Sequence, residues 1–272
     1  MPAQNLPGLI LDRAHPLARG LVGWWPLNEG GGRYAADVTG NMPGLLVNDP
    51  ARTGSRNGNA VLFDGSNDYV NIPHDPRQQF SATLTFCAWV CPTSGTSYPP
   101  LLSKTNGATD GYSWEFNNGA PETSIALWHY AGGWGAKGYS TIPNAVWSFV
   151  ATVMDGATEK FYLNGYQVNS YANTDTISAS TVALQICGST SLSRYGGGGV
   201  SHMRAYNRAL SAMDIREIYA NPLAGALAPS RVARVYVAAA VADPPAVPTR
   251  PLSADRLNNR TFARNWRRGE TG

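Results

Sequence analysis

Short runs of β-prone residues separated by turn signals recur along most of this chain and restrict it to an all-β fold. The runs follow one another at roughly 8–15 residues, a spacing typical of β-sandwiches and jelly rolls. In the run Ala82–Val90, Leu84, Phe86, Ala88 and Val90 are predicted to face one side of a sheet, because side chains alternate along a strand. The expected strands are 20–27, 60–63, 68–72, 82–90, 101–104, 112–117, 123–128, 147–154, 160–163, 181–186 and 200–206.

One short helix is predicted near the end of this region. Ser211 is a good N-cap, and Asp214 three residues later completes a capping-box pattern. Ile215 and Ile218 share one face, and Pro222 ends the helix. We expect the helix to pack on the edge of the sandwich.

Composition divides the chain into three parts. Residues 1–19 contain three Pro and no clean periodicity, which indicates an extended arm. Residues 20–225 carry the strand pattern and form the expected domain. Residues 226–272 are rich in Pro and Ala, carry eight Arg and three acids, and have too little apolar surface to fold alone. A strand over 231–241 is the one element expected there.

The C-terminal arm is a candidate docking element, because guanidinium groups pair with carboxylates on a protein surface. We expect it to bind an acidic surface of a partner chain, and a homo-oligomer is a further option. Phosphate pairing makes nucleic acid the weaker alternative. The candidate residues are Arg231, Arg234, Arg250, Arg256, Arg260, Arg264, Trp266, Arg267 and Arg268.

The cysteines and the N-terminus favour a reducing compartment. Cys87 and Cys91 lie four residues apart on one predicted strand, about 13 Å, which is too far for a disulfide. Three Cys without framework spacing are expected to be buried and reduced. We see no signal peptide and no run long enough to cross a membrane.

Six sequence segments, taken in chain order, resemble laminin-G-like, concanavalin A-like lectin–glucanase domains. They lie at 20–32, 37–41, 60–73, 85–92, 147–165 and 202–222. The resemblance implies two antiparallel sheets packed face to face. Such domains occur as lectins, as accessory modules of glycosidases and adhesins, and in bacteriophage particles. The phrasing at 15–30 is similar to stand-alone domains of tailed phages.

Catalysis is not expected. Retaining glycosidases need two carboxyl groups about 5–5.5 Å apart, and the Glu-x-Asp-x-x-Glu run of glucanase relatives is absent. Glu115 is the best single acid, but its strand offers no second one, and Glu122 lies beyond a turn. No HExxH motif or G-x-S-x-G elbow is present, and the glycines 196–199 suggest a loop hinge.

Two binding sites are candidates. The resemblance places Ca²⁺ ligands near Asp64, Asn67 and Asp68, whose oxygens suit a hard cation, although a purely structural turn is the alternative. The second candidate is the aromatic loop with Tyr130, Trp134 and Tyr139, which could stack on a sugar or anchor a protein contact. Trp128, at the end of a strand, is expected in the core.

These observations predict a non-enzymatic protein of the virion surface, one that decorates or cements a tailed-phage head and docks through its two arms. The main alternative is a lectin that contacts host glycans through Ca²⁺ or the aromatic loop. The two roles are compatible. A glycoside hydrolase is disfavoured by the missing carboxylate pair.

Overall fold

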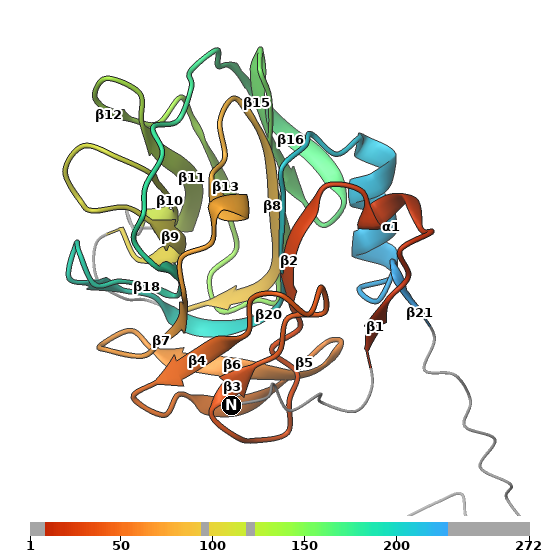
Figure 1. Ribbon diagram of the computed structural model, residues 1–272. Coiled ribbons are helices and arrows are strands. Elements are labelled where there is room, and N and C mark those ends of the chain that lie inside the picture. The colour runs from red at the N-terminus through yellow and green to blue at the C-terminus, as the bar shows by residue number, and fades with distance from the viewer. Residues whose placement is uncertain (1–8, 94–97, 118–122, 228–272) are drawn as a thin grey trace, which may run out of the picture. The chain divides into compact units, whose positions relative to one another are not determined.

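The computed structural model describes residues 9–93, 98–117 and 123–227, and shows two antiparallel sheets packed face to face with one helix behind them (Figure 1). We call the sheet on the left of Figure 1 the front sheet. It runs β12 (Trp134–Gly135), β11 (Thr123–Tyr130), β10 (Tyr112–Asn117), β9 (Pro100–Lys104), β17 (Leu184–Ile186), β7 (Tyr69–Ile72), β4 (Gly44–Val47) and β3 (Tyr34–Ala35), with β13 (Tyr139–Ile142) also paired to β11.

The back sheet lies between the front sheet and the helix. It runs β16 (Tyr166–Ala172), β15 (Thr158–Leu163), β14 (Ser148–Asp155), β8 (Thr83–Pro92), β20 (Gly197–Tyr206), β6 (Gly58–Asp64) and β5 (Ala51–Ser55), with β2 (Leu21–Trp25) also paired to β20. Two short antiparallel pairs complete the described part, β1 (Ile10–Leu11) with β21 (Ala226–Leu227) and the hairpin of β18 (Gly188–Ser189) with β19 (Arg194–Tyr195). The two-sheet antiparallel sandwich is confirmed.

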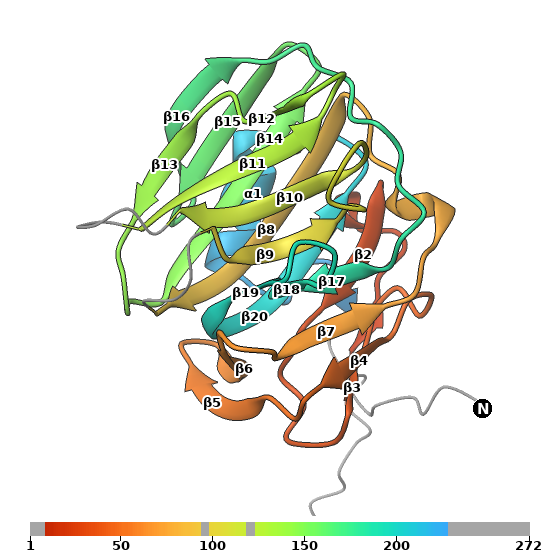
Figure 2. The same cartoon turned by 90° about the vertical axis from the view of Figure 1, so that its left-hand side faces the viewer.

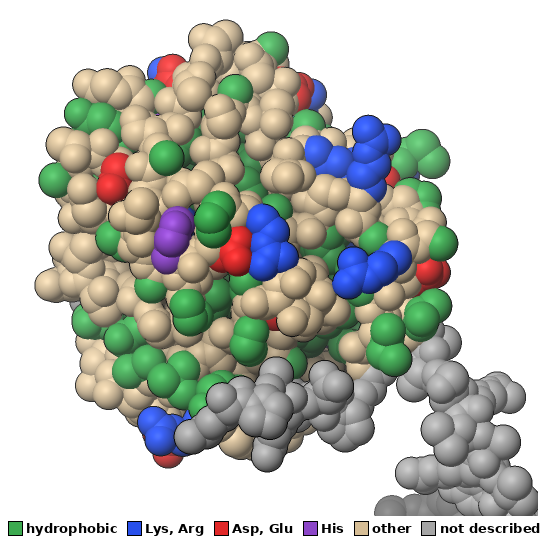
Figure 3. Space-filling view, viewed as in Figure 1, with side chains coloured by type: hydrophobic (Ala, Val, Ile, Leu, Met, Phe, Trp, Pro, Cys, Tyr) green, Lys and Arg blue, Asp and Glu red, His purple; other side chains and the backbone are tan. Residues whose placement is uncertain are grey.

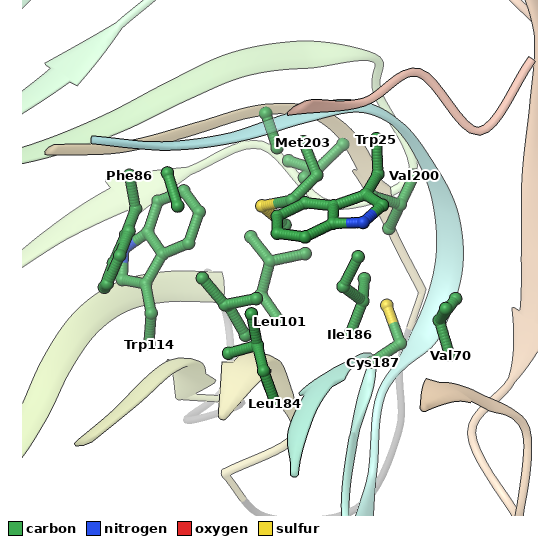
Figure 4. Packing of buried hydrophobic residues seen from close by; sticks show 14 of the residues in the cluster. Trp25, Val70, Phe86, Leu101, Trp114, Leu184, Ile186, Cys187, Val200 and Met203 are labelled. Carbon is green, nitrogen blue, oxygen red and sulfur yellow. The ribbon is translucent and has the colours of Figure 1, made fainter. Parts of the chain in front are cut away.

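The main core fills the space between the two sheets. Figure 4 shows Trp25 and Met203 of the back sheet packed towards Leu101 and Ile186 of the front sheet. Along β8, Leu84, Phe86, Ala88 and Val90 all point into this core, while Cys87 and Trp89 point to the opposite face. The predicted alternation of this strand is therefore confirmed, and it explains why β8 can serve two cores at once.

The helix α1 (Ala212–Ala220) forms as predicted, with a reciprocal capping box between Ser211 and Asp214. Its expected place on the sandwich edge is wrong. Ile215 and Ile218 are buried in a second cluster with Trp89 of β8 and Phe149 of β14, which are central strands of the back sheet. The helix thus covers the outer face of the back sheet, because that face is itself apolar, and each buried Ile contributes about 1.5–3 kcal/mol.

The ends of the domain differ from the expected boundaries at 19 and 226. Ile10–Leu11 pairs with Ala226–Leu227, and Leu17 is 1% exposed within the second cluster. Residues 10–19 are therefore held on the domain by backbone pairing and apolar burial rather than forming a free arm. Residues 228–272 lie outside the described residues, so the Arg-rich docking arm and the strand at 231–241 stay predictions.

The glycines 196–199 are not a loop hinge, which corrects the prediction. Gly197, Gly198 and Gly199 are buried residues of β20, the strand that pairs with both β6 and β8. A Cβ on Gly199 would lie 2.7 Å from the ring of Trp147. Gly199 is glycine because an aromatic ring packs directly on the strand backbone, whereas Gly198 has φ +117° and its Cβ would lie 2.3 Å from the carbonyl oxygen of Cys91.

The three cysteines are free, with Cys87 and Cys187 buried. Burial raises the pKa of the Cys87 thiol to about 12, so this group is an inert part of the second cluster. No helix in residues 9–93, 98–117 and 123–227 is long and apolar enough to cross a membrane.

Candidate functional site

The outer face of the front sheet carries a pocket of about 240 Å³. Figure 2 looks onto this face, with β10 and β9 in front and the short β18–β19 pair beside them. The pocket is lined by Tyr98, Gly107, Ser113, Glu115, Trp128, Trp134, Leu192 and Arg194. It combines aromatic walls with a small number of polar groups, the usual make-up of a ligand site.

The floor of the pocket follows from the alternation of β10. Tyr112, Trp114 and Phe116 point into the main core, so Ser113 and Glu115 must point outwards. The register with β11 places Ser113 opposite Trp128 and Glu115 opposite Ala126. The small Ala126 leaves space above Glu115, whereas Trp128 builds a wall beside Ser113.

Three aromatic side chains form the walls. Tyr98 and Trp128 meet edge to face, with ring centroids 6.1 Å apart. Trp134 is fixed by a 2.9 Å hydrogen bond from its Nε1 to the carbonyl oxygen of Ala108 and by an edge contact with Tyr130 at 6.1 Å. These contacts hold the rings in place before any ligand arrives, which lowers the entropy cost of binding.

The charged groups of the pocket are Glu115 and Arg194. Glu115 is 2% exposed, and this burial raises its pKa to about 7, although the Ser113 hydroxyl and the Arg194 charge oppose the shift. The Ser113 hydroxyl donates a 2.8 Å hydrogen bond to Oε2 of Glu115. Nη1 of Arg194 lies 3.7 Å from the same oxygen, and its guanidinium carbon lies 5.5 Å from the centre of the Tyr98 ring.

The three aromatic residues predicted to form one binding site take different positions relative to the pocket. Trp134 lines the pocket, Tyr130 supports it from the side, and Tyr139 is 59% exposed on β13, outside the lining. The expectation that Trp128 lies in the core is wrong, because Leu127 takes the inward position and turns Trp128 to the outer face. Trp128 lies two residues after Ala126 on β11, so the two side chains share the outer face, and this spacing could have predicted its position.

Glu115 and Arg194 were not predicted as a binding pair. The sequence marks Glu115 only as a candidate catalytic acid, and Arg194 lies on β19, far away in the sequence. Among the described residues that line the pocket, Glu115 is the only acid. Glu122 lies outside the described residues. The described part of the lining therefore shows one carboxyl group, whereas retaining hydrolysis requires a pair.

A second hollow of about 230 Å³ lies next to the pocket on the same face. It is lined by Ser103, Thr105, Val182, Ala183, Gln185, Thr190 and Ser191. Ser103 on β9 is paired with Ser113 of the pocket floor, and the Ser191 hydroxyl donates to the Thr105 carbonyl oxygen at 2.6 Å. The two hollows thus share a floor, and this hydrogen bond joins the loops that surround them.

The proposed Ca²⁺ ligands form a hydrogen-bonded turn. Oδ1 of Asp64 accepts backbone N–H bonds from Ser66, Asn67 and Asp68, and Oδ2 of Asp68 accepts one from the Asp64 N–H. Two of their four carboxylate oxygens are thus used by the backbone. No group of three or more His, Cys, Asp or Glu in the described part of the chain could hold a metal ion. The two carboxylate oxygens left over are fewer than the roughly six to eight oxygens that Ca²⁺ takes, so further ligands would be needed and Ca²⁺ binding stays a prediction.

Basic side chains form no obvious nucleic-acid surface on the face drawn in Figure 3. Lys and Arg appear there as separate groups, several of them beside acids, rather than as one patch. Among the described residues, Arg77 pairs with Asp75 and Arg208 with Asp214. A surface that binds the phosphate backbone needs clustered, unpaired cations.

The described part of the chain is a two-sheet antiparallel sandwich with an aromatic-walled pocket on the outer face of one sheet. The chain belongs to the concanavalin A-like lectin/glucanases superfamily, because the Laminin_G_3 family matches residues 64–216, more than half of its length. No curated protein matches the chain by sequence.

Solved structures share the fold at low sequence identity. Domain 4 of AbnA, an extracellular arabinanase of Geobacillus stearothermophilus, matches with TM-score 0.59 and 17% identity over 75% of this chain and 98% of that domain. The receptor-binding domain of botulinum neurotoxin type G matches with TM-score 0.55 and 13% identity over 76% of this chain and 54% of that one. Trypanosoma rangeli sialidase matches with TM-score 0.52 and 18% identity over 74% of this chain and 32% of the enzyme.

Proposed function

We propose that this protein is a non-enzymatic, lectin-like module that binds glycans in the pocket on the front sheet. The observation that carries the proposal is the arrangement of Trp128, Trp134 and Tyr98 around the polar floor of Ser113 and Glu115. Sugar rings have apolar faces that stack on aromatic rings and hydroxyls at their edges that need polar partners. The pocket offers both kinds of group in its lining.

The comparisons support the same class of ligand. The structure of arabinanase domain 4 holds arabinotriose, and this chain covers 98% of that domain. The single carboxyl group of the described lining argues for binding rather than hydrolysis, although glycosidases also occur among the structural neighbours. The polar second hollow, with Gln185 and Thr190, extends the surface for further sugar units.

Glycan-array screening followed by calorimetric titration tests this proposal. We expect the wild type to bind at least one oligosaccharide, and Trp128→Ala or Trp134→Ala to weaken binding by at least about tenfold, since each removes a stacking surface. Tyr139→Ala is the matched control, because it removes an exposed aromatic ring outside the pocket. Absence of any glycan ligand, or an equal loss in the Tyr139 variant, would refute the proposal.

The virion-surface role is a separate proposal and depends on the C-terminal arm. Its support is the Pro- and Arg-rich composition of that arm and the phage-like phrasing at 15–30. Co-sedimentation of the full chain and of residues 1–227 with purified phage heads tests it. Binding that requires residues 228–272 supports a decoration protein, and equal binding of both forms contradicts an arm that docks.

A further inference from the structure

Arg194 is the only cation among the described residues that line the pocket. It projects from β19, and its guanidinium lies over the Tyr98 ring. Its side chain is 38% exposed, while that of Glu115 is 3% exposed. The cation therefore lies at the open side of the pocket and the carboxyl group at its closed end.

Glu115 does not saturate the hydrogen-bonding capacity of Arg194. The 3.7 Å separation between Nη1 and Oε2 is longer than a hydrogen bond, and Oε2 already accepts the Ser113 hydroxyl. A guanidinium has five N–H donors in a planar fork that matches a carboxylate. Arg194 therefore has N–H donors available for the two oxygens of a ligand carboxylate.

The protonation of Glu115 adds to this positive balance near neutral pH. Burial raises its pKa to about 7, so part of the population carries a proton there and leaves Arg194 uncompensated. The other titratable groups of the described pocket lining are Arg194 on β19 and Tyr98 before β9. The residues paired with Glu115 on β9 and β11, Pro100 and Ala126, carry no charge.

We propose that the pocket selects glycans that carry a carboxylate, and that Arg194 is the residue that determines this specificity. The inference rests on the proposed glycan binding and narrows its ligand to acidic sugars. The sugar ring stacks between Trp128 and Trp134 while its carboxylate accepts two hydrogen bonds from the Arg194 fork. A protonated Glu115 at the floor donates to the same ligand rather than repelling it.

Matched ligand pairs test the proposal. Trigalacturonic acid and sialyllactose are titrated beside their methyl esters, which keep the ring and remove the charge. We expect at least one acid to bind at least about tenfold more tightly than its ester. Arg194→Gln should remove this preference. Arg216→Gln is the matched control, since Arg216 also lies over an aromatic ring, that of Tyr166 at 4.8 Å, but outside the pocket.

The protonation of Glu115 has its own readout. Wild-type affinity for the acid should fall between pH 6 and pH 8 as Glu115 ionises, and Glu115→Gln should abolish this fall. An acid and an ester that bind equally, or an Arg194→Gln variant that keeps the preference, overturn the inference while glycan binding stands. If only neutral glycans bind on the array, the inference of carboxylate specificity is likewise overturned while glycan binding stands. If no glycan on the array binds, the proposed glycan-binding function itself is refuted.

Discussion

The hydroxyl of Ser113 donates a hydrogen bond to Oε2 of Glu115, two residues further along the same face of β10. This bond favours the ionised carboxylate, yet burial dominates and raises the pKa of Glu115 from 4.5 to about 7. An acid with a raised pKa binds its proton more tightly in the folded state. Its contribution to stability is therefore full below pH 4.5 and is lost as the pH rises towards 7.

Glu115→Gln should reduce this loss of stability. The shift corresponds to a change on the order of 3 kcal/mol in the free energy of unfolding between pH 4.5 and pH 8. Urea denaturation at both pH values measures it. Asp49→Asn, which removes an exposed carboxylate between β4 and β5, is the control and should leave this pH dependence nearly unchanged. Identical pH profiles for the wild type and the Glu115 variant would contradict the assigned burial.

Arg204 and Trp24 form a buried cation–π pair behind the back sheet. The guanidinium carbon lies 3.7 Å from the centre of the Trp24 ring, both residues are 0% exposed, and Nη2 donates to the Pro222 carbonyl oxygen at 2.5 Å. No carboxylate pairs with Arg204 within the described ranges. Arg204→Lys should cost about 1–3 kcal/mol, because a compact ammonium loses the planar stack.

Arg204→Met is the informative comparison for this pair. It removes the charge but fills much of the volume, and replacement of a buried charge by an apolar side chain is often neutral. We therefore expect the Met variant to be at least as stable as the Lys variant in chemical denaturation. A Lys variant with wild-type stability would show that the stacking of the guanidinium contributes nothing.

Gly111 fixes the loop between β9 and β10 that borders the pocket. It has φ +78°, and an added Cβ would lie 1.9 Å from the carbonyl oxygen of Lys104. Gly111→Ala should therefore destabilise the fold by more than about 1 kcal/mol through strain and steric clash. Gly133→Ala, where a Cβ meets nothing within 4 Å, is the control. Thermal melts compare them, and equal melting temperatures would argue against the predicted strain.

The pairing of β1 with β21 predicts where the domain ends. Ile10 pairs with Leu227 and Leu11 with Ala226, so residues 1–225 lack the partner strand of β1 whereas residues 1–227 retain it. Loss of about 1 kcal/mol of backbone pairing should lower the melting temperature of the shorter form by about 2–4 °C. Calorimetry of the two forms decides the matter. A shorter form that melts no lower would restore the boundary at 225.

The fold could be predicted where local chemistry determines the element. The alternation of β8 and the capping box at Ser211 are both readable within ten residues and both formed. The strand β16 (Tyr166–Ala172) was missed because it is a sheet edge whose residues are largely exposed, so no apolar alternation marks it.

The site was harder to predict than the fold. Trp134 could be recognised as an aromatic residue among glycines, but the pocket also depends on Arg194 meeting Glu115, which requires the pairing of distant strands. The sequence around β10 and β19 does not indicate how these two distant strands are placed relative to each other in the fold. The position of Trp128 follows from local alternation, because Ile125 and Leu127 face the core and the residue after Leu127 must therefore face outwards.

The pairing of β1 with β21 also has a practical consequence. The two ends of the described domain lie side by side, next to α1 (Figure 1). The pocket instead opens on the outer face of the front sheet. The domain can therefore be inserted into a surface loop of another protein, because its two ends lie close enough to join the two ends of that loop. Copies grafted in this way would display their pockets outwards, and an array of them would turn a weak single-site contact into avid capture.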